Sequence, residues 1–258
     1  MIKKIMLRSN SIYFGAILFL LISSCKTSNA GNENKEGFVE IFDGKTLQGW
    51  EGDPKYWKVE EGNLVGEVTP STLLDRNTFI IWQGGEPGDF ELKGEFRITK
   101  SGNSGINYRS IQLDDYQYGL KGYQADIDGK NNYTGQNYEE RGRTTLAYRG
   151  EEVVVETSEN PSSSLRNKIK NNAWTQRSVT GSLGNPALLG DHIKKEDWNE
   201  IHLIVNNNRL RHYVNGVLMS DVIDNDSENR KFKGKLGVQV HVGPPMKVEY
   251  RNLRLKQL

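Results

Sequence analysis

Three polar side chains alternate along one short stretch of this 258-residue chain, the heptapeptide GYQADID. If the stretch is a β-strand, Gln124, Asp126 and Asp128 share one face and the less polar residues between them share the other. A solvated strand face ordinarily carries Lys, Thr or Ser, so an amide and two carboxylates in a row indicate a site for acid–base chemistry. The alternative is a structural ion-pair network, because Arg141 and Arg143 follow closely in the sequence.

The same region also offers ligands for a metal ion. Asp126, Asp128 and Glu139 carry the oxygen atoms that hard divalent cations prefer. Their spacing specifies no particular ion, so a divalent cation stays an open cofactor at this point.

Two further groups of polar residues occur on other predicted strands. In NSGINYRS, Arg109 alternates in phase with Asn107, and an inward Arg needs a carboxylate partner or an anionic or hydroxylated ligand. In VQVHVGPPM, Gln239 and His241 share one strand face, where the histidine is a candidate acid or base. Each has a simpler alternative, since an Arg at a strand end is often solvated and a lone His is more often structural.

Short alternating runs, closed by Gly, Asn or Asp, must position these residues. They recur along the chain as FVEIF, WKVEEGNLVGE, FELKGEFRIT, SGINYRS, GYQADID, TTLAYRGEEVVVE, NEIHLIV, LRHYVNGVLMSDVI, KLGVQVHV and KVEYRNLRL. This spacing, without any long helical period, predicts an all-β sandwich or barrel. The polar segment Thr157–Gly190 interrupts the pattern, with a short helix expected near Pro186 to Leu189, and is interpreted as a flap beside a site or as a decorated edge.

The N-terminal residues predict where the protein is located. Residues 1–24 combine a basic start with a short apolar run and small residues, as a signal peptide does. Cys25 is the only cysteine, so it has no disulfide partner in the chain, and its position after Ile-Ser-Ser resembles the lipidation site of a bacterial lipoprotein. Residues 25–36 are small and polar, as expected of a flexible tether, and residues 37–258 form the predicted folded domain. We therefore expect a lipid-anchored protein of the bacterial cell envelope, periplasmic or surface-facing.

Composition and motifs exclude several classes of function. The net charge of +1 gives no basic excess for nucleic acid, and no second apolar run predicts a membrane span, so the membrane contact expected is the lipid anchor alone. The sequence also lacks the Gly-x-Ser-x-Gly, His-Glu-x-x-His, phosphate-loop and dinucleotide-binding motifs.

Six segments, taken in order, resemble the 3-keto-disaccharide hydrolase family: GFVEIFDGKTLQGW, GNSGINYRS, GYQADID, YTGQNYEERGR, DWNEIHLIVNNNRLRHYVNG and LGVQVHVGPPMKVEYRNLRLK. The resemblance covers nearly all of residues 37–258. It implies a concanavalin-like jelly-roll sandwich, as in lectins and glucanases, in a single domain. It also implies cleavage of glycosides whose sugar carries a ketone at the third carbon, so that a carbohydrate is the expected partner.

The resemblance also implies which residues form the site. Arg109, Gln239 and His241 match family motifs, whereas Gln124 stands where many members have Glu and Asp126 where they have Gln. This departure indicates a subfamily. An amide at position 124 can neither attack nor release a proton, so ordinary retaining hydrolysis by two carboxylates on this strand is disfavoured.

A 3-keto sugar can be cleaved instead by elimination followed by hydration, which needs a base, an acid and a group that stabilises an enolate. Asp126, Glu139 and His241 are the predicted catalytic residues, with acid and base unassigned. The predicted substrate-binding residues are Arg109, Gln124, Tyr138, Arg141 and Gln239. The alternatives are a lectin-like carbohydrate-binding module without catalysis, which the supply of Trp and Tyr would suit, and a structural or adhesion lipoprotein.

Overall fold

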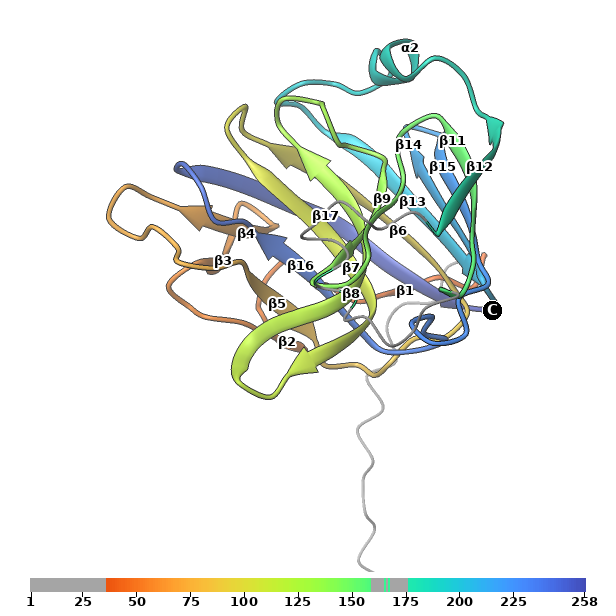
Figure 1. Cartoon of the computed structure of the whole chain (residues 1–258). Helices are drawn as coiled ribbons and strands as arrows, with labels where there is room; N and C mark the ends of the chain where they lie inside the picture. The colour runs from red at the N-terminus through yellow and green to blue at the C-terminus, as the bar shows by residue number, and fades with distance from the viewer. Residues whose placement is uncertain (1–35, 159–164, 166, 168–175) are drawn as a thin grey trace, which may run out of the picture. The chain divides into compact units, whose positions relative to one another are not determined.

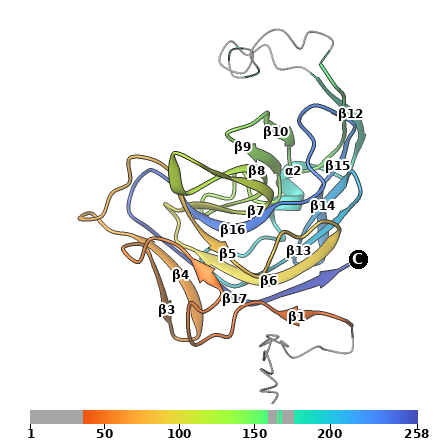
Figure 2. The same ribbon diagram turned by 90° about the horizontal axis from the view of Figure 1, so that it is seen from below.

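The computed structural model describes residues 36–158, 165, 167 and 176–258. These residues form two β-sheets that pack face to face (Figure 1, Figure 2). In spatial order the larger sheet consists of β12 (Arg177–Ser182), β11 (Glu151–Val155), β15 (Val217–Asp224), β14 (Arg209–Val214), β13 (Asn199–Asn206), β6 (Phe90–Ile98), β17 (Met246–Gln257), β4 (Asn63–Val68) and β3 (Trp57–Glu60), with β1 (Val39–Glu40) paired to β17.

The smaller sheet carries most of the residues singled out in the sequence. Its strands, in spatial order, are β10 (Thr144–Ala147), β9 (Asn137–Glu140), β8 (Tyr116–Asp128), β7 (Asn103–Leu113), β16 (Lys235–Val240), β5 (Thr78–Trp82) and β2 (Trp50–Glu51). All neighbouring strands in it are antiparallel, and the larger sheet departs from this only where β11 runs parallel to β15. The prediction of a jelly-roll sandwich is therefore confirmed.

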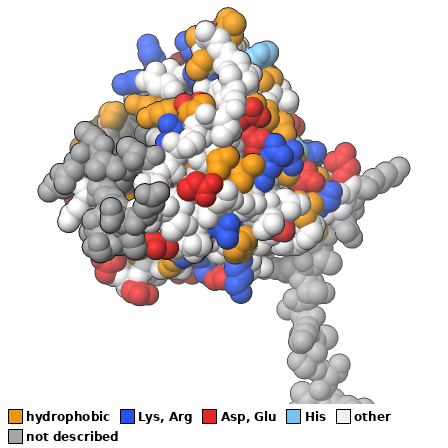
Figure 3. All heavy atoms as spheres, turned by 45° about the vertical axis from the view of Figure 1, so that its right-hand side comes forward, with side chains coloured by type: hydrophobic (Ala, Val, Ile, Leu, Met, Phe, Trp, Pro, Cys, Tyr) orange, Lys and Arg blue, Asp and Glu red, His pale blue; other side chains and the backbone are white. Residues whose placement is uncertain are grey.

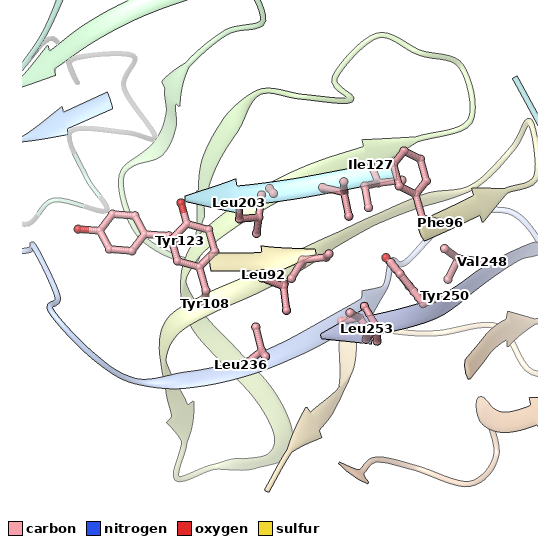
Figure 4. Packing of buried hydrophobic residues seen from close by; sticks show 14 of the residues in the cluster. Leu92, Phe96, Tyr108, Tyr123, Ile127, Leu203, Leu236, Val248, Tyr250 and Leu253 are labelled. Carbon is pink, nitrogen blue, oxygen red and sulfur yellow. The ribbon is translucent and has the colours of Figure 1, made fainter. Parts of the chain in front are cut away.

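The core between the sheets is built from alternate strand positions. On β8, Tyr123, Ala125 and Ile127 are fully buried in it, as the period of two predicted. The Tyr123 ring stacks on that of Tyr108 from β7, with centroids 5.5 Å apart, and Leu203 of the opposite sheet lies beside them (Figure 4). Burying a large side chain such as Ile127 or Leu203 contributes about 2 kcal/mol, and this burial fixes the register of β8 and turns its intervening residues away from the larger sheet.

Part of the segment between residues 157 and 190 is regular structure. Residues 177–182 form edge strand β12 against β11, and α2 (Pro186–Gly190) confirms the short helix. Asn185 caps α2 by accepting a hydrogen bond from the Ala187 amide. Residues 159–164, 166 and 168–175 of the expected flap lie outside the described residues, as do the signal peptide, Cys25 and the tether up to residue 35.

The surface of the sandwich carries mixed charge. Lys and Arg side chains are interspersed with Asp and Glu on the face shown in Figure 3. Among the described residues, no helix is long and apolar enough to cross a membrane.

Candidate active site

A polar pocket of about 590 Å³ lies on the smaller sheet. Its walls come from the loop before β5, the start of β7, the end of β8, the loop and strand around β9, and the end of β16. The lining residues are Asp75, Arg76, Asn77, Asn103, Gln124, Asp126, Tyr133, Gln136, Tyr138, Glu140, Arg141, Thr145, His241 and Val242. A space of this size accommodates a sugar residue together with its leaving group.

Asp126 lies on the pocket wall with its carboxylate held by two amides. Gln124 Nε2 donates to Oδ1 over 2.6 Å, and Gln136 Nε2 donates to Oδ2. Asp126 is only 8% exposed, and it forms no ion pair with any residue that the structure describes. The ion-pair alternative for Asp126 is therefore wrong, because Arg143 and Arg141 are paired with other carboxylates.

The surroundings of Asp126 favour its neutral form. Burial is the main cause that raises the pKa of its carboxyl to about 7, and the nearby negative charges of Glu140 and Asp128 contribute in the same direction. The two glutamine amides oppose this, since they bind the ionised form. A carboxyl with a pKa near neutrality can both take up and release a proton at physiological pH.

A chain of amides joins Asp126 to a second pocket carboxylate, Glu140. Gln124 donates to Asp126 and accepts from Gln239 Nε2 over 3.2 Å, and the same nitrogen of Gln239 lies 3.4 Å from Glu140 Oε2. Asn77 donates to Glu140 Oε1 over 3.3 Å. Gln124 therefore lies between the two carboxylates and orients Asp126, which explains why an amide occupies position 124.

The rim of the pocket carries the positive and aromatic groups. Arg141 Nε lies 3.7 Å from Glu140 Oε1, outside hydrogen-bond range, so this buried nitrogen has no hydrogen-bond partner. His241 directly follows β16 and lies on the same side as Gln239, and its Nδ1 donates to the Val242 carbonyl over 2.6 Å. Tyr133 is 47% exposed and Tyr138 is half-buried, so both rings can contact a sugar.

Glu139, predicted as catalytic, does not line this pocket. Alternation along β9 turns Tyr138 and Glu140 toward the pocket and Glu139 into the space between the sheets. There Glu139 accepts two hydrogen bonds from the guanidinium of Arg143, at 2.8 and 3.0 Å, and Arg143 also pairs with Asp224 at 2.7 Å. The expectation that Glu139 approaches Asp126 is wrong, and the same period of two could have identified Glu140.

Arg109 is also absent from the pocket, although its sequence phase placed it beside Asn107. The pairing of β7 with β8 shifts register between Tyr108 and Ile111, and Arg109 has a φ of 44° at this bulge. The bulge reverses the direction of the side chain, which is fully buried and donates to Gly88 O, Asn207 O and Asp89. Arg109 thus ties loops together, and a role in substrate binding is not supported by its position.

Asp128 shapes the loop that closes the site. Its Oδ1 accepts from the amides of Tyr133 and Thr134 at 2.7 and 2.9 Å, and its Oδ2 accepts from the Asn132 amide. This holds residues 129–136 in a turn that presents Tyr133 and Gln136 to the pocket. Gln136 was not predicted from the sequence, because only the turn held by Asp128 brings it back to the pocket.

The described residues include no group of three or more His, Cys, Asp or Glu side chains arranged to hold a metal ion. The described part of the interpreted flap does not line the pocket either, because β12 and α2 lie elsewhere on the sandwich.

Comparison with known proteins gives a consistent assignment. A family model described as the 3-keto-alpha-glucoside-1,2-lyase-like domain matches residues 37–256. A 3-keto-disaccharide hydrolase of Bacteroides thetaiotaomicron is 33% identical over 92 residues, a match that covers 30% of this chain and 29% of that protein.

Solved structures show the same fold at low identity. A protein of Parabacteroides distasonis ATCC 8503, provisionally named a glycosyl hydrolase, superposes with a TM-score of 0.53 at 15% identity, covering 86% of this chain and 99% of that one. A Bacillus subtilis protein of unknown function with a galectin-like fold gives a TM-score of 0.51 at 13% identity, with coverages of 82% and 90%. The resemblance noted in the sequence is confirmed by the family model, which spans most of the chain. The chain belongs to the family of 3-keto-alpha-glucoside-1,2-lyase-like domains.

Proposed function

We propose that the protein cleaves the glycosidic bond of 3-keto-disaccharides or related 3-keto-glycosides. The observation that carries the proposal is Asp126, a buried carboxyl with a pKa of about 7 in a pocket large enough for a sugar. The family assignment and the partial match to a 3-keto-disaccharide hydrolase support this choice of substrate.

The proposed reaction begins with proton removal. The ketone at the third carbon acidifies the hydrogen on the second carbon, and ionised Asp126 removes it as general base. The electron pair left behind forms an enolate and then expels the glycosidic oxygen from the first carbon. Water adds across the resulting double bond, so the products are a 3-keto sugar and a free alcohol.

Two groups on the rim complete this chemistry. Arg141 lines the pocket, and its guanidinium can stabilise the negative oxygen of the enolate. His241 stands at the half-exposed edge, where it can protonate the departing oxygen. In this proposal Glu140 raises the pKa of Asp126 and orients Arg141 and Gln239.

Sugar binding is assigned to the remaining polar and aromatic groups. Gln124 and Gln239 hold the carboxylates in place, and Gln239 Oε1 is buried with no hydrogen-bond partner among the described residues. Gln239 is fully buried and does not line the pocket, so its predicted part in substrate binding is limited to positioning Gln124 and Glu140. Tyr133 and Tyr138 provide aromatic surface for the apolar face of a ring.

We also propose a cellular location from the sequence alone. Removal of residues 1–24 and lipidation of Cys25 would anchor the domain in the bacterial envelope through a short tether. There the domain would meet glycosides before their import.

A second candidate is a carbohydrate-binding module without catalysis, which the exposed Tyr133 ring and the hydroxyl-binding amides would also suit. One assay separates the two. Incubation with a chromogenic 3-keto-glucoside should release the chromophore, with the unmodified glucoside as control. Binding of the 3-keto compound without release of chromophore would establish the module and reject the enzyme.

A further inference from the structure

A hydrogen-bonded chain of buried side chains crosses from the larger sheet to the active-site loop. His212 on β14 is 1% exposed, and its Nε2 lies 2.8 Å from the hydroxyl of Tyr108 on β7. Asn137 Nδ2 donates to the same hydroxyl over 3.2 Å and lies 3.4 Å from His212 Nε2. All three side chains are buried between the sheets, where polar groups are placed only at a cost.

The partners of His212 define which ring nitrogen carries the proton. Its Nδ1 lies 3.2 Å from the carbonyl oxygen of Gln136, which can only accept, so Nδ1 carries the hydrogen. Nε2 of the neutral ring is then an acceptor, and the Tyr108 hydroxyl donates to it. Burial lowers the pKa of His212 to about 4, in agreement with this neutral tautomer.

Gln136 connects this chain to Asp126. Its side-chain Nε2 donates to Asp126 Oδ2, and its carbonyl accepts from the Asp126 amide over 3.3 Å as well as from His212. The carbonyl that His212 holds and the amide that binds Asp126 belong to one residue. A displacement of the backbone at Gln136 therefore changes the hydrogen bond on the Asp126 carboxyl.

We propose that His212 is a positioning residue for the reaction: by donating to the Gln136 carbonyl, it holds the Gln136 amide against the Asp126 carboxyl. The inference rests on the proposed function, in which Asp126 is the base. His212 does not touch the pocket and acts through Gln136.

The groups around His212 and Asp126 determine the direction in which the pKa of Asp126 should change. His212 faces neutral Tyr108 and Asn137, and Asp221 on the neighbouring strand β15 is the charged group that acts on it. Asp126 faces the carboxylates of Glu140 and Asp128, which raise its pKa, and the amide of Gln136, which lowers it. Loss of the Gln136 hydrogen bond should therefore raise the pKa of Asp126 further.

The test follows Asp126 directly, without turnover. In protein labelled with ¹³C at Asp carboxyl groups, the Asp126 resonance is identified by its absence from D126N and titrated by NMR. His212→Leu and Gln136→Leu should both raise the pKa of Asp126, by about one unit. His212→Asn should keep the original titration, because the Asn amide nitrogen lies near the position of Nδ1. His202→Leu removes a histidine that pairs with Glu91 away from the pocket, and it should leave the titration unchanged.

Kinetics provide the second readout. His212→Leu should lower kcat about tenfold, with a much smaller change in KM, and His212→Asn should restore most of it. Where His212→Leu does not fold, Tyr108→Phe replaces it. Without the Tyr108 hydroxyl, no O–H donor to Nε2 holds the proton of His212 on Nδ1, so the pKa of Asp126 should change in the same direction. An unchanged Asp126 titration in Gln136→Leu overturns the inference. So does an unchanged titration in His212→Leu, or in Tyr108→Phe where that variant is used instead. An active D126N protein would instead reject the proposed function, whatever the titrations show.

Discussion

Gln124 and Asp126 stand two residues apart on β8, and the amide of the first donates to the carboxylate of the second over 2.6 Å. Both side chains are buried, and both line the pocket. The bond leaves the Gln124 oxygen free to accept from Gln239 on β16, so one amide couples two strands and orients the carboxyl. The polar face of the heptapeptide is thus a preorganised site for Asp126.

Replacing Asp126 with Asn should remove activity without unfolding the protein. The change keeps shape but removes the base, so turnover should fall on the order of 10²-fold or more. The raised pKa of Asp126 means that its contribution to stability is full below its unfolded pKa and is lost as the pH rises through about 7. Asn should therefore raise the melting temperature most clearly above pH 7. Normal turnover by D126N, measured with the melting curves, would contradict the assignment.

The pH dependence of kcat/KM should report the pKa of Asp126. Because the base must be ionised, the acidic limb of the profile should have its midpoint at about pH 7. Glu140→Gln removes a negative charge that raises this pKa, so the midpoint should move to lower pH. A profile whose acidic limb lies near pH 4, in either protein, would show that Asp126 is not the titrating group.

Replacing Glu139 with Gln should affect mainly the stability of the protein, whereas replacing its neighbour Glu140 with Gln should affect mainly the kinetics. Glu139→Gln leaves Arg143 with one buried partner fewer and should cost on the order of 3 kcal/mol of stability. Glu140 lines the pocket, so Glu140→Gln should change the kinetics and keep the melting temperature within a few degrees of that of the unsubstituted protein. Chemical denaturation and steady-state kinetics on the two variants test this pair. Equal loss of stability in both would refute the division of β9 into an inner and an outer face.

Cys25→Ala should prevent anchoring. Without the thiol there is no site for lipid, so unprocessed or soluble precursor should replace the membrane-bound form. Fractionation of cells with an antibody against the domain measures the change, and Ser24→Ala is a control that keeps the thiol. Membrane attachment that survives in Cys25→Ala would show another means of localisation.

The sequence by itself determined the fold class and the faces of the strands. A period of two placed Tyr123, Ala125 and Ile127 in the core and Gln124 and Asp126 opposite them, because buried apolar area fixes the register of a strand. The same rule placed Gln239 and His241 on one side of β16 and its continuation.

Only the tertiary structure decided which polar residues meet. Arg109 does not lie on the predicted strand face, because a one-residue β-bulge reverses the direction of its side chain. Glu139 points away from the pocket because it pairs with Arg143, whose further partners Asp224 and Asp226 are distant in sequence. Gln136 and His212 come together across two sheets, and no local pattern encodes a contact between residues 76 positions apart. Local periodicity fixes where a side chain points, whereas the pairing of distant strands decides what it touches.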